Sequence, residues 1–244
     1  PAFKLGAFTN PNKKVRQEAI DLTKRAIESL REIDSNLLTI WLGQDGFDYG
    51  FQVDYKKVWD DEISAIREVA EYDKDCLVSI EYKPNEPRAY SLLSNLGTTL
   101  LAIKEINLHN LGVTIDFAHI LYSNEQPALV AALIDKHSQI LGLHLNDGYG
   151  KRDDGLMVGS VHQLATIELL YHISKSKYDG PIYFDTFPDT TNMDPIKECE
   201  LNISTVNQQL KLVDKLIKNN ELSTAIENQD SITSHRIFNS ILYS

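Results

Sequence analysis

Acidic residues and one histidine end four successive apolar runs of the sequence. Glu81 closes VSIE, Asp116 closes VTID, His144 closes LGLH and Asp185 closes IYFD. If these runs are parallel strands, their carboxyl ends meet on one face and the four side chains surround a common centre. Crowded carboxylates repel one another and take up protons unless a cation lies between them. The pattern therefore predicts a divalent-metal site, and this mixture of oxygen ligands with one imidazole suits Mn²⁺, Mg²⁺ or Co²⁺, with Zn²⁺ as an alternative.

Each of these residues also has an ordinary structural explanation. A carboxylate at the end of a strand often caps a helix or faces solvent, and a single histidine in an apolar run is more often a hydrogen-bonded core residue. The repetition on four successive runs favours the metal interpretation. We expect structural roles for the histidines in predicted helices or at helix ends, which are His109, His137, His162, His172 and His235. We expect a solvated helix start for the acidic patch of Asp60, Asp61 and Glu62.

Six apolar runs of strand length each precede a stretch with helical periodicity. The first is FKLGAF, and in the helix after it Asn10 is the expected N-cap and Pro11 the first residue. The others are NLLTIWLG, CLVSIE, GVTID, QILGLH and GPIYFD, followed by expected helices near residues 55–72, 92–107, 127–137, 161–174 and up to 219. Strands that are apolar throughout and alternate with helices predict an α/β fold with a parallel sheet covered by helices.

Two architectures fit this alternation, an open doubly wound sheet and a (β/α)₈ barrel. No glycine-rich phosphate-binding motif of the GxGxxG or GxxxxGK[ST] kind follows any of the runs, which weakens the nucleotide-binding version of the open sheet. The residues after Asn220 supply no further apolar run and are expected to form one or two short helices.

Charge and composition exclude several classes of partner. The formal net charge of −11 argues against a nucleic-acid backbone, which binds to clustered lysine and arginine. We expect no membrane partner, because no apolar run approaches the roughly 18 residues that a membrane span needs. The only cysteines, Cys76 and Cys199, lie far apart, so neither a disulfide framework nor a thiolate zinc site is expected. A cytoplasmic protein is the expectation.

Two segments resemble a known enzyme family. EYKPNEPR, at residues 81–88, is similar to the strand-end motif of xylose isomerases, and IDFAH, ending at His119, looks like that family's acidic residue followed by a metal-binding histidine. The order of Glu, Asp with His, His and Asp resembles the L-rhamnose isomerase branch of the xylose isomerase-like TIM-barrel superfamily. TIWLGQDGFDYGFQ is similar to the tryptophan-bearing segment of that branch's fourth strand.

The resemblance implies a (β/α)₈ TIM barrel of xylose isomerase-like type. On this alignment residues 1–219 hold units three to eight as a single domain, residues 220–244 form a C-terminal helical tail, and the first two βα units are absent from this chain. A six-stranded fragment would expose two unpaired edges, so we expect another chain or a different arrangement of the first and last segments to cover them. We expect a homo-oligomer, either a dimer or a tetramer.

The resemblance also implies a set of metal ligands. A first ion would be held by Glu81, Asp116, His144 and Asp185. A second, catalytic ion would be bridged by Asp116 and held by His119 and Asp153. The family usually has a further aspartate where this sequence has Gly155, so a complete second site would need Asp154 or Asp147 to take that role.

Two more residues acquire roles from the resemblance. Lys83 would contact the carbonyl end of the substrate and polarise its oxygen, and Trp41 would form an apolar wall against the sugar carbons. The catalytic residues are therefore expected to be Lys83, Asp153 and His119, with a small-molecule sugar as the partner.

The function that the resemblance implies is aldose–ketose isomerisation of L-rhamnose or a related free sugar, by a hydride shift that divalent metals, Mn²⁺ first among them, assist. One alternative is a sugar 3-epimerase that transfers protons through Glu81 and Asp185. Another is a truncated barrel that binds sugar without catalysis. A DNA-repair phosphodiesterase of the same superfamily would call for a basic face and more ligand histidines, and the sequence has neither.

Overall fold

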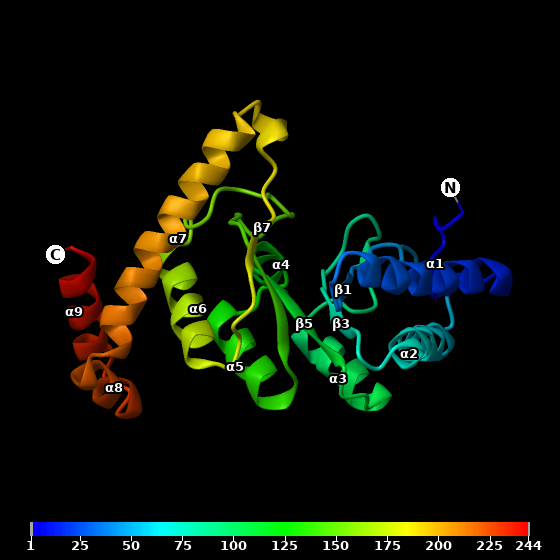
Figure 1. Ribbon diagram of the computed structural model, residues 1–244, viewed down its shortest axis with the longest axis horizontal. Coiled ribbons are helices and arrows are strands. Elements are labelled where there is room, and N and C mark those ends of the chain that lie inside the picture. Colours follow the sequence, from blue (N-terminus) through cyan, green and yellow to red (C-terminus); the bar gives the residue numbers. More distant parts are fainter. Residues whose placement is uncertain (1, 244) are drawn as a thin grey trace.

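A parallel sheet forms the centre of the protein. The computed structural model describes residues 2–243, apart from the side chain of Thr191 (Figure 1). Five parallel strands within that range form one sheet in the order β1–β3–β5–β6–β7. Their bounds are β1 Leu37–Ile40, β3 Leu77–Ile80, β5 Leu111–Asp116, β6 Ile140–Leu145 and β7 Ile182–Phe184. All residues of β5 are buried, as expected for a central strand of a covered parallel sheet.

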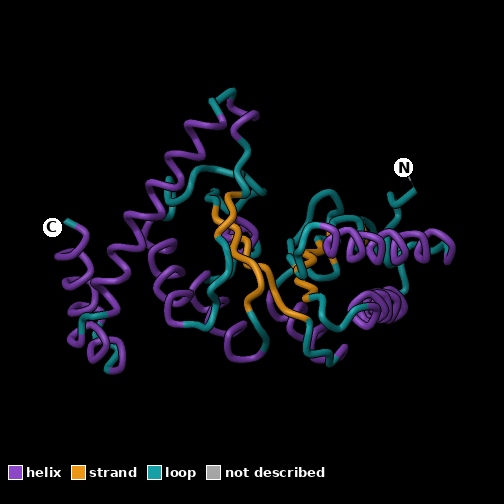
Figure 2. Tube along the Cα trace, in the orientation of Figure 1, coloured by secondary structure: helices purple, strands orange, loops and turns teal. Residues whose placement is uncertain are grey.

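Helices connect the strands and cover one side of the sheet (Figure 2). They are α1 Lys13–Glu32, α2 Tyr55–Tyr72, α3 Leu96–Ile106, α4 Phe117–Tyr122, α5 Pro127–His137, α6 Gln163–Lys175, α7 Pro195–Ile217, α8 Asn220–Glu227 and α9 Ser231–Leu242, with a 3₁₀ turn at Pro188–Thr191. Side chains at several helix starts, such as Asp54 and Asp194, accept hydrogen bonds from first-turn N–H groups. Among the described helices, none combines the length and apolar character that a membrane crossing requires.

The expected alternation of parallel strands and helices is confirmed, but the expected six strands are not. The described residues form a five-stranded half-barrel, three strands short of a closed eight-stranded barrel. The run FKLGAF forms turns, with Gly6 at a φ of +112° and its N–H donated to Phe3. The N–H groups of Ala7 and Thr9 donate to the Asp45 carboxylate, so they are not available to a strand beside β1.

The beginning of α1 also differs from the expectation. Asn12, rather than Asn10, is the N-cap, and its side chain accepts a hydrogen bond from the N–H of Lys14. Asn10 is buried and donates to the carbonyl of Gly6, so it stabilises the preceding turn instead. Pro11 consequently lies before the helix rather than at its first position.

Two short elements were not predicted. Strands β2 (Gly46–Phe47) and β4 (Tyr90–Ser91) pair antiparallel outside the main sheet, with the rings of Phe47 and Tyr90 stacked at 5.1 Å. They join the loop after β1 to the loop after β3. Because the second loop carries Lys83, this pairing restrains a segment in which the sequence predicts functional residues.

Helices α8 and α9 follow α7 as a compact pair at the C-terminal end (Figure 1). Buried Leu222 of α8 and Ile237 of α9 belong to the same core as Val213 of α7. The pair agrees with the short helices expected after residue 220. The division into a barrel domain and a separate tail stays a prediction.

The acidic patch of Asp60, Asp61 and Glu62, expected to be a solvated helix start, lies inside α2 instead, and one of its residues is buried. Because α2 begins at Tyr55, Glu62 lies in its third turn and faces the core, where it is fully buried. Neither of its carboxylate oxygens has a hydrogen-bond partner among the described residues. Burial raises the pKa of Glu62 well above its usual value, and the nearby charge of Asp45 raises it further.

We expect Glu62→Gln to stabilise the protein. Folding requires Glu62 to take up a proton at any pH between its ordinary pKa and its raised pKa, so the free energy of unfolding falls as pH rises through that window. Glutamine keeps the size without this cost. A gain of about 1 kcal/mol would raise the Tm by roughly 2–4 °C at pH 8, with a smaller difference at pH 5.

Differential scanning calorimetry at both pH values measures this effect. Glu71→Gln, which changes an exposed glutamate of the same helix, serves as the control and should leave the Tm unchanged. A Glu62→Gln protein that melts at a lower temperature than the unchanged protein at pH 8 would contradict the expectation.

Candidate functional site

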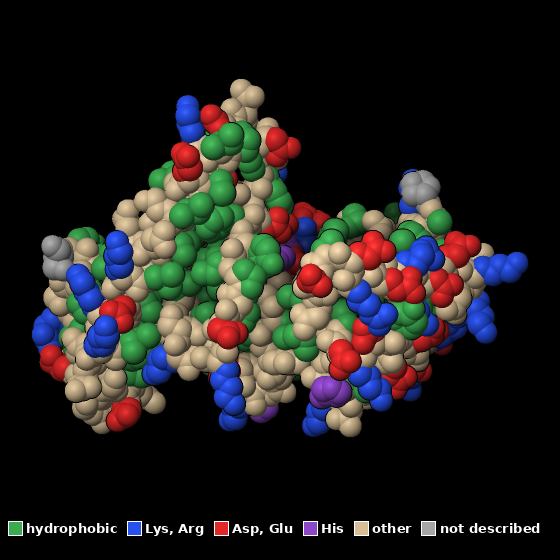
Figure 3. Space-filling view, viewed as in Figure 1, with side chains coloured by type: hydrophobic (Ala, Val, Ile, Leu, Met, Phe, Trp, Pro, Cys, Tyr) green, Lys and Arg blue, Asp and Glu red, His purple; other side chains and the backbone are tan. Residues whose placement is uncertain are grey.

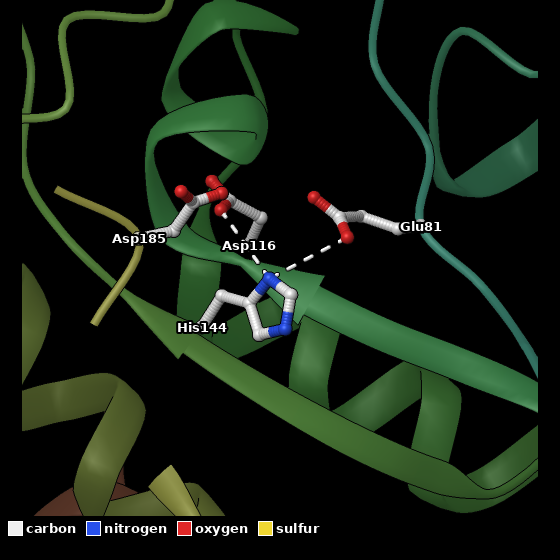
Figure 4. Close-up of side chains that lie close together, drawn as sticks. All are labelled: Glu81, Asp116, His144 and Asp185. Carbon is white, nitrogen blue, oxygen red and sulfur yellow. Dashed lines mark ion pairs between the residues drawn. The ribbon is translucent and has the colours of Figure 1, made fainter. Parts of the chain in front are cut away.

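The carboxyl ends of four neighbouring strands bring the predicted ligand residues together. Asp116 of β5 and His144 of β6 lie opposite each other in the strand register, while Glu81 follows β3 and Asp185 follows β7. One ligand atom from each of the four side chains lies within 4.8 Å of all the others (Figure 4). The parallel register therefore produces the convergence that the sequence predicts.

The imidazole of His144 lies among the carboxylates. Its Nδ1 atom is 3.4 Å from Glu81 Oε2 and 3.9 Å from Asp116 Oδ2, and the ring packs edge-on against Tyr183. This Nδ1 is buried and makes no well-formed hydrogen bond within the described part of the chain. A buried nitrogen without a donor or acceptor, surrounded by carboxylate oxygens, fits a ligand of a divalent cation.

Burial and mutual repulsion disturb the titration of these groups. Burial raises the pKa of Asp116 to about 6, although the neighbouring His119 opposes the shift. Burial, followed by the charge of Glu81, also raises the pKa of Asp185. Both carboxylates thus resist ionisation in the absence of a cation, as the sequence predicts for crowded acidic side chains. A bound divalent ion would favour their charged forms.

A second group of donors adjoins the first. His119 lies in α4, and Asp116 caps that helix by accepting the His119 N–H at 2.9 Å. The Nε2 atom of His119 is 3.1 Å from Asp153 Oδ2, and its Nδ1 atom is 3.4 Å from Glu81 Oε1. Burial opposes a charged imidazole, but Asp116, Asp153 and Glu81 outweigh it and raise the pKa of His119 to about 9. The two groups therefore share Glu81 and Asp116.

In the loop that carries Asp153, the backbone conformation and a neighbouring ring favour glycine at position 155. Gly155 has a φ of +56°, and a Cβ atom there would lie 2.3 Å from the ring of Phe187. An aspartate would be both strained and obstructed. Asp154 accepts hydrogen bonds from Tyr149 N and Arg152 Nε.

Asp147 is also bound elsewhere. It is fully buried and accepts hydrogen bonds from the N–H groups of Val161 and His162. Its other oxygen lies 2.8 Å from Nδ1 of the same histidine, which agrees with the structural role expected for His162. Of the aspartates in this loop, Asp153 is the one that contacts His119.

Lys83 lies beside both groups. Its Nζ atom is 3.1 Å from Asp153 Oδ2 and 3.2 Å from Glu86 Oε2, and it lies 5.4 Å from the centre of the Trp41 ring. Burial favours the neutral amine, but Asp153 and Glu86 outweigh it and raise the pKa of Lys83. A charged ammonium is therefore held at the edge of the site. Trp41 is half-exposed and lines a small hollow together with Glu81 and Lys83.

The arrangement combines two neighbouring sets of oxygen and nitrogen atoms that could hold metal ions, and it places the Lys83 ammonium and the Trp41 ring beside them. Such a site can hold two oxygens of a polyhydroxylated molecule and stabilise negative charge on one of them. Figure 3 shows acidic, basic and histidine side chains together in the recess between the part containing α1 and α2 and the part containing α7.

Sequence reasoning missed two residues of this site. Asn146 is fully buried and donates to Asp116, and Glu86 is the second partner of Lys83. A signal existed for Asn146, because side chains alternate along a strand and position 146 follows His144 by two residues. Glu86 offered no such signal, since its position depends on the loop after β3.

The amino-acid sequence is similar to those of two known enzymes. The chain is 29% identical to the xylose isomerase of Thermus thermophilus over 191 residues, covering 76% of this chain and 49% of that protein. It is 27% identical to the xylose isomerase of Thermus caldophilus, with the same coverage. The chain thus spans about half the length of the curated relatives that it matches.

Solved structures share the fold. A D-tagatose 3-epimerase-like protein matches with a TM-score of 0.73 and 21% identity, over 86% of this chain and 75% of that one. An L-ribulose 3-epimerase matches with a TM-score of 0.72 and 15% identity, over 89% of this chain and 76% of that one. The family described as xylose isomerase-like TIM barrel matches residues 2–203, which is most of the sequence. The chain therefore belongs to the xylose isomerase-like TIM-barrel family, whose members include sugar isomerases and epimerases.

Proposed function

We propose that this protein is a divalent-metal-dependent sugar isomerase that moves the carbonyl group of a free sugar between C1 and C2 by a hydride shift. The observation that carries the proposal is the convergence of Glu81, Asp116, His144 and Asp185 within 4.8 Å. These residues would hold one ion, and His119 with Asp153 would help to hold a second beside the shared Asp116. When bound, the ions polarise the carbonyl group and bring the two sugar oxygens together.

The side chains around the ligands supply the remaining chemistry. The ammonium of Lys83 would stabilise negative charge that develops on the carbonyl oxygen. Asp153 and His119, 3.1 Å apart, would line the space in which a proton passes between the two sugar oxygens. Trp41 would cover the sugar carbons and exclude water. In a hydride shift the hydrogen passes directly from carbon to carbon, so no side chain needs to act as a base at carbon.

Sugar 3-epimerisation is the second candidate function, because proteins of that name share the fold. Proton transfer at one carbon needs bases on both of its faces, and Glu81 and Asp185 would be those bases. Asp185 is one methylene shorter than a glutamate and therefore reaches less far toward carbon. The curated relatives at 29% and 27% identity are named xylose isomerases, which also favours isomerisation. A half-barrel that binds sugar without catalysis is the third candidate.

Membership of the family does not specify the substrate, the metal or the cellular location. Within isomerases we propose L-rhamnose or a related free sugar as substrate, from the order of the ligand residues in the sequence. We propose Mn²⁺ as the metal, because the ligands are mainly carboxylate oxygens. The cytoplasmic location expected from the sequence stays a prediction.

Isotope transfer distinguishes the two chemistries. In D₂O, we expect the isomerised sugar to contain little carbon-bound deuterium, because a hydride shift does not exchange with solvent. Mass spectrometry of the product measures the incorporation. Near-stoichiometric deuterium would favour proton transfer, and turnover that survives exhaustive dialysis against EDTA would overturn the metal-dependent mechanism.

The ligand assignment predicts a loss of metal affinity. Glu81→Gln removes a charged oxygen from both donor groups, so we expect Mn²⁺ to bind more than about 10-fold more weakly, since even changes outside the ligand set commonly cost 10–100-fold. Isothermal titration calorimetry measures the effect. Glu125→Gln is the matched control, because Glu125 is a partly buried glutamate that binds Tyr82 and the start of α3 instead. Equal affinities in all three proteins would refute the assignment.

The exposed edges of the sheet support the proposal of a homo-oligomer. Within the described residues, β1 and β7 each pair with one neighbour. Apolar side chains, among them Phe3, Leu22 and Leu38, line a groove along β1. On the other side Tyr183 of β7 is half-exposed, and Figure 3 shows a broad hydrophobic area beside α7. We propose that further βα units of a barrel or a second copy cover these edges.

We expect this chain to form dimers or tetramers at micromolar concentration, because association removes exposed apolar surface from water. Size-exclusion chromatography with multi-angle light scattering measures the assembly mass. A mass equal to that of one chain across the concentration range would contradict the proposal.

A further inference from the structure

The buried amide of Asn146 connects the two sets of ligand residues. Asn146 is fully buried directly after β6. Its Nδ2 atom donates to both carboxylate oxygens of Asp116, each at 3.2 Å, and to the backbone carbonyl of Asp185 at 3.0 Å. Its Oδ1 atom accepts the N–H of Ala118 in α4 at 2.8 Å. Because the oxygen binds an N–H group and the nitrogen binds oxygens, the amide has one consistent orientation.

The position of this amide limits how Asp116 can act. The nitrogen is equidistant from both oxygens of the carboxylate, so it occupies the space between them through which a single ion would chelate both. Asp116 Oδ2 then remains available on the side of His144, at 3.9 Å from that residue's Nδ1. Oδ1 faces His119, whose N–H and Nδ1 lie 2.9 Å and 3.9 Å away.

We infer that Asn146 is a positioning residue that divides the two oxygens of Asp116 between the two donor groups. The amide keeps Asp116 from turning both oxygens toward one ion. Its bond to the carbonyl of Asp185 also couples the end of β7 to the end of β5. This inference rests on the proposed metal-dependent function, since it concerns how the same site presents its ligands.

Asn146→Asp tests the donor directly. Aspartate has nearly the same size and retains the oxygen that accepts from Ala118, but it places a second oxygen against the Asp116 carboxylate. We expect Mn²⁺ to bind about 10–100-fold more weakly, the usual cost of losing a group that orients a ligand. Isothermal titration calorimetry measures the affinity, and differential scanning calorimetry measures the rise in Tm on saturation with Mn²⁺, which we expect to shrink. Asn146→Leu, which removes the donor without adding charge, should weaken binding similarly.

Asn110 provides a matched control at the opposite end of the neighbouring strand. It is also a buried asparagine, and its amide donates to the carbonyls of Ala70 and Cys76 at 2.9 and 2.8 Å. Asn110→Leu should lower the Tm of the metal-free protein without changing Mn²⁺ affinity, because it loses buried hydrogen bonds far from the ligands. A merely structural role for Asn146 predicts this same behaviour.

The outcomes separate this inference from the function on which it rests. Unchanged or tighter Mn²⁺ binding in both Asn146 variants would overturn the inference and leave the proposed function intact. If the protein without any substitution binds no Mn²⁺, the proposed function is overturned as well. Weaker binding in both Asn146 variants, with normal affinity in Asn110→Leu, supports the positioning role.

Discussion

Crowding of like charges at one end of the sheet is the constraint on which the rest of the structure depends. Asp116 and Glu81 are both buried, and Asp185 lies beside them. Isolated carboxylates in such a place are costly, so each must find donors or a cation. The structure supplies donors to Asp116 from the start of α4 and from Asn146. The short helix α4 begins directly after β5, and its first-turn N–H group stabilises the negative charge of Asp116, which is the N-cap.

The loop at residues 146–157 holds Asp153 by hydrogen bonds that do not involve Glu81, Asp116, His144 or Asp185. Asp147 and Leu156 exchange two backbone hydrogen bonds of 2.9 Å, which close the loop at its base. The carboxylate of Asp147 binds the start of α6, and Gly155 allows Phe187 to pack against the loop. The loop is thus fixed at both ends while Asp153 reaches inward to His119 and Lys83. A position fixed in this way reduces the entropy lost when a ligand binds.

The sequence predicts those features that depend on local pattern. Continuously apolar runs predict parallel strands, and polar residues at their ends predict a shared face, because register aligns Asp116 with His144. Features that depend on distant partners could not be predicted. FKLGAF is apolar enough for a strand, yet the N–H group of Ala7 within this run donates to Asp45, which lies 38 residues away in the sequence. The charged side chain of Glu62 predicts a surface position, but α2 begins at Tyr55, and this start directs Glu62 toward the core.

A shared fold does not decide between moving a hydride and moving a proton, because both of the proposed reactions would use the same candidate metal site. The decision depends on how far a base can reach toward carbon. The carbonyl of Asp185 is bound by Asn146, which ties the backbone at that point to Asp116. Under the proposed function, a short side chain on a restrained backbone would stay beside Glu81, Asp116 and His144 rather than extend over the substrate. The hydrogen bond from Asn146 to the backbone of Asp185 therefore supports the proposed hydride shift over proton abstraction by this side chain.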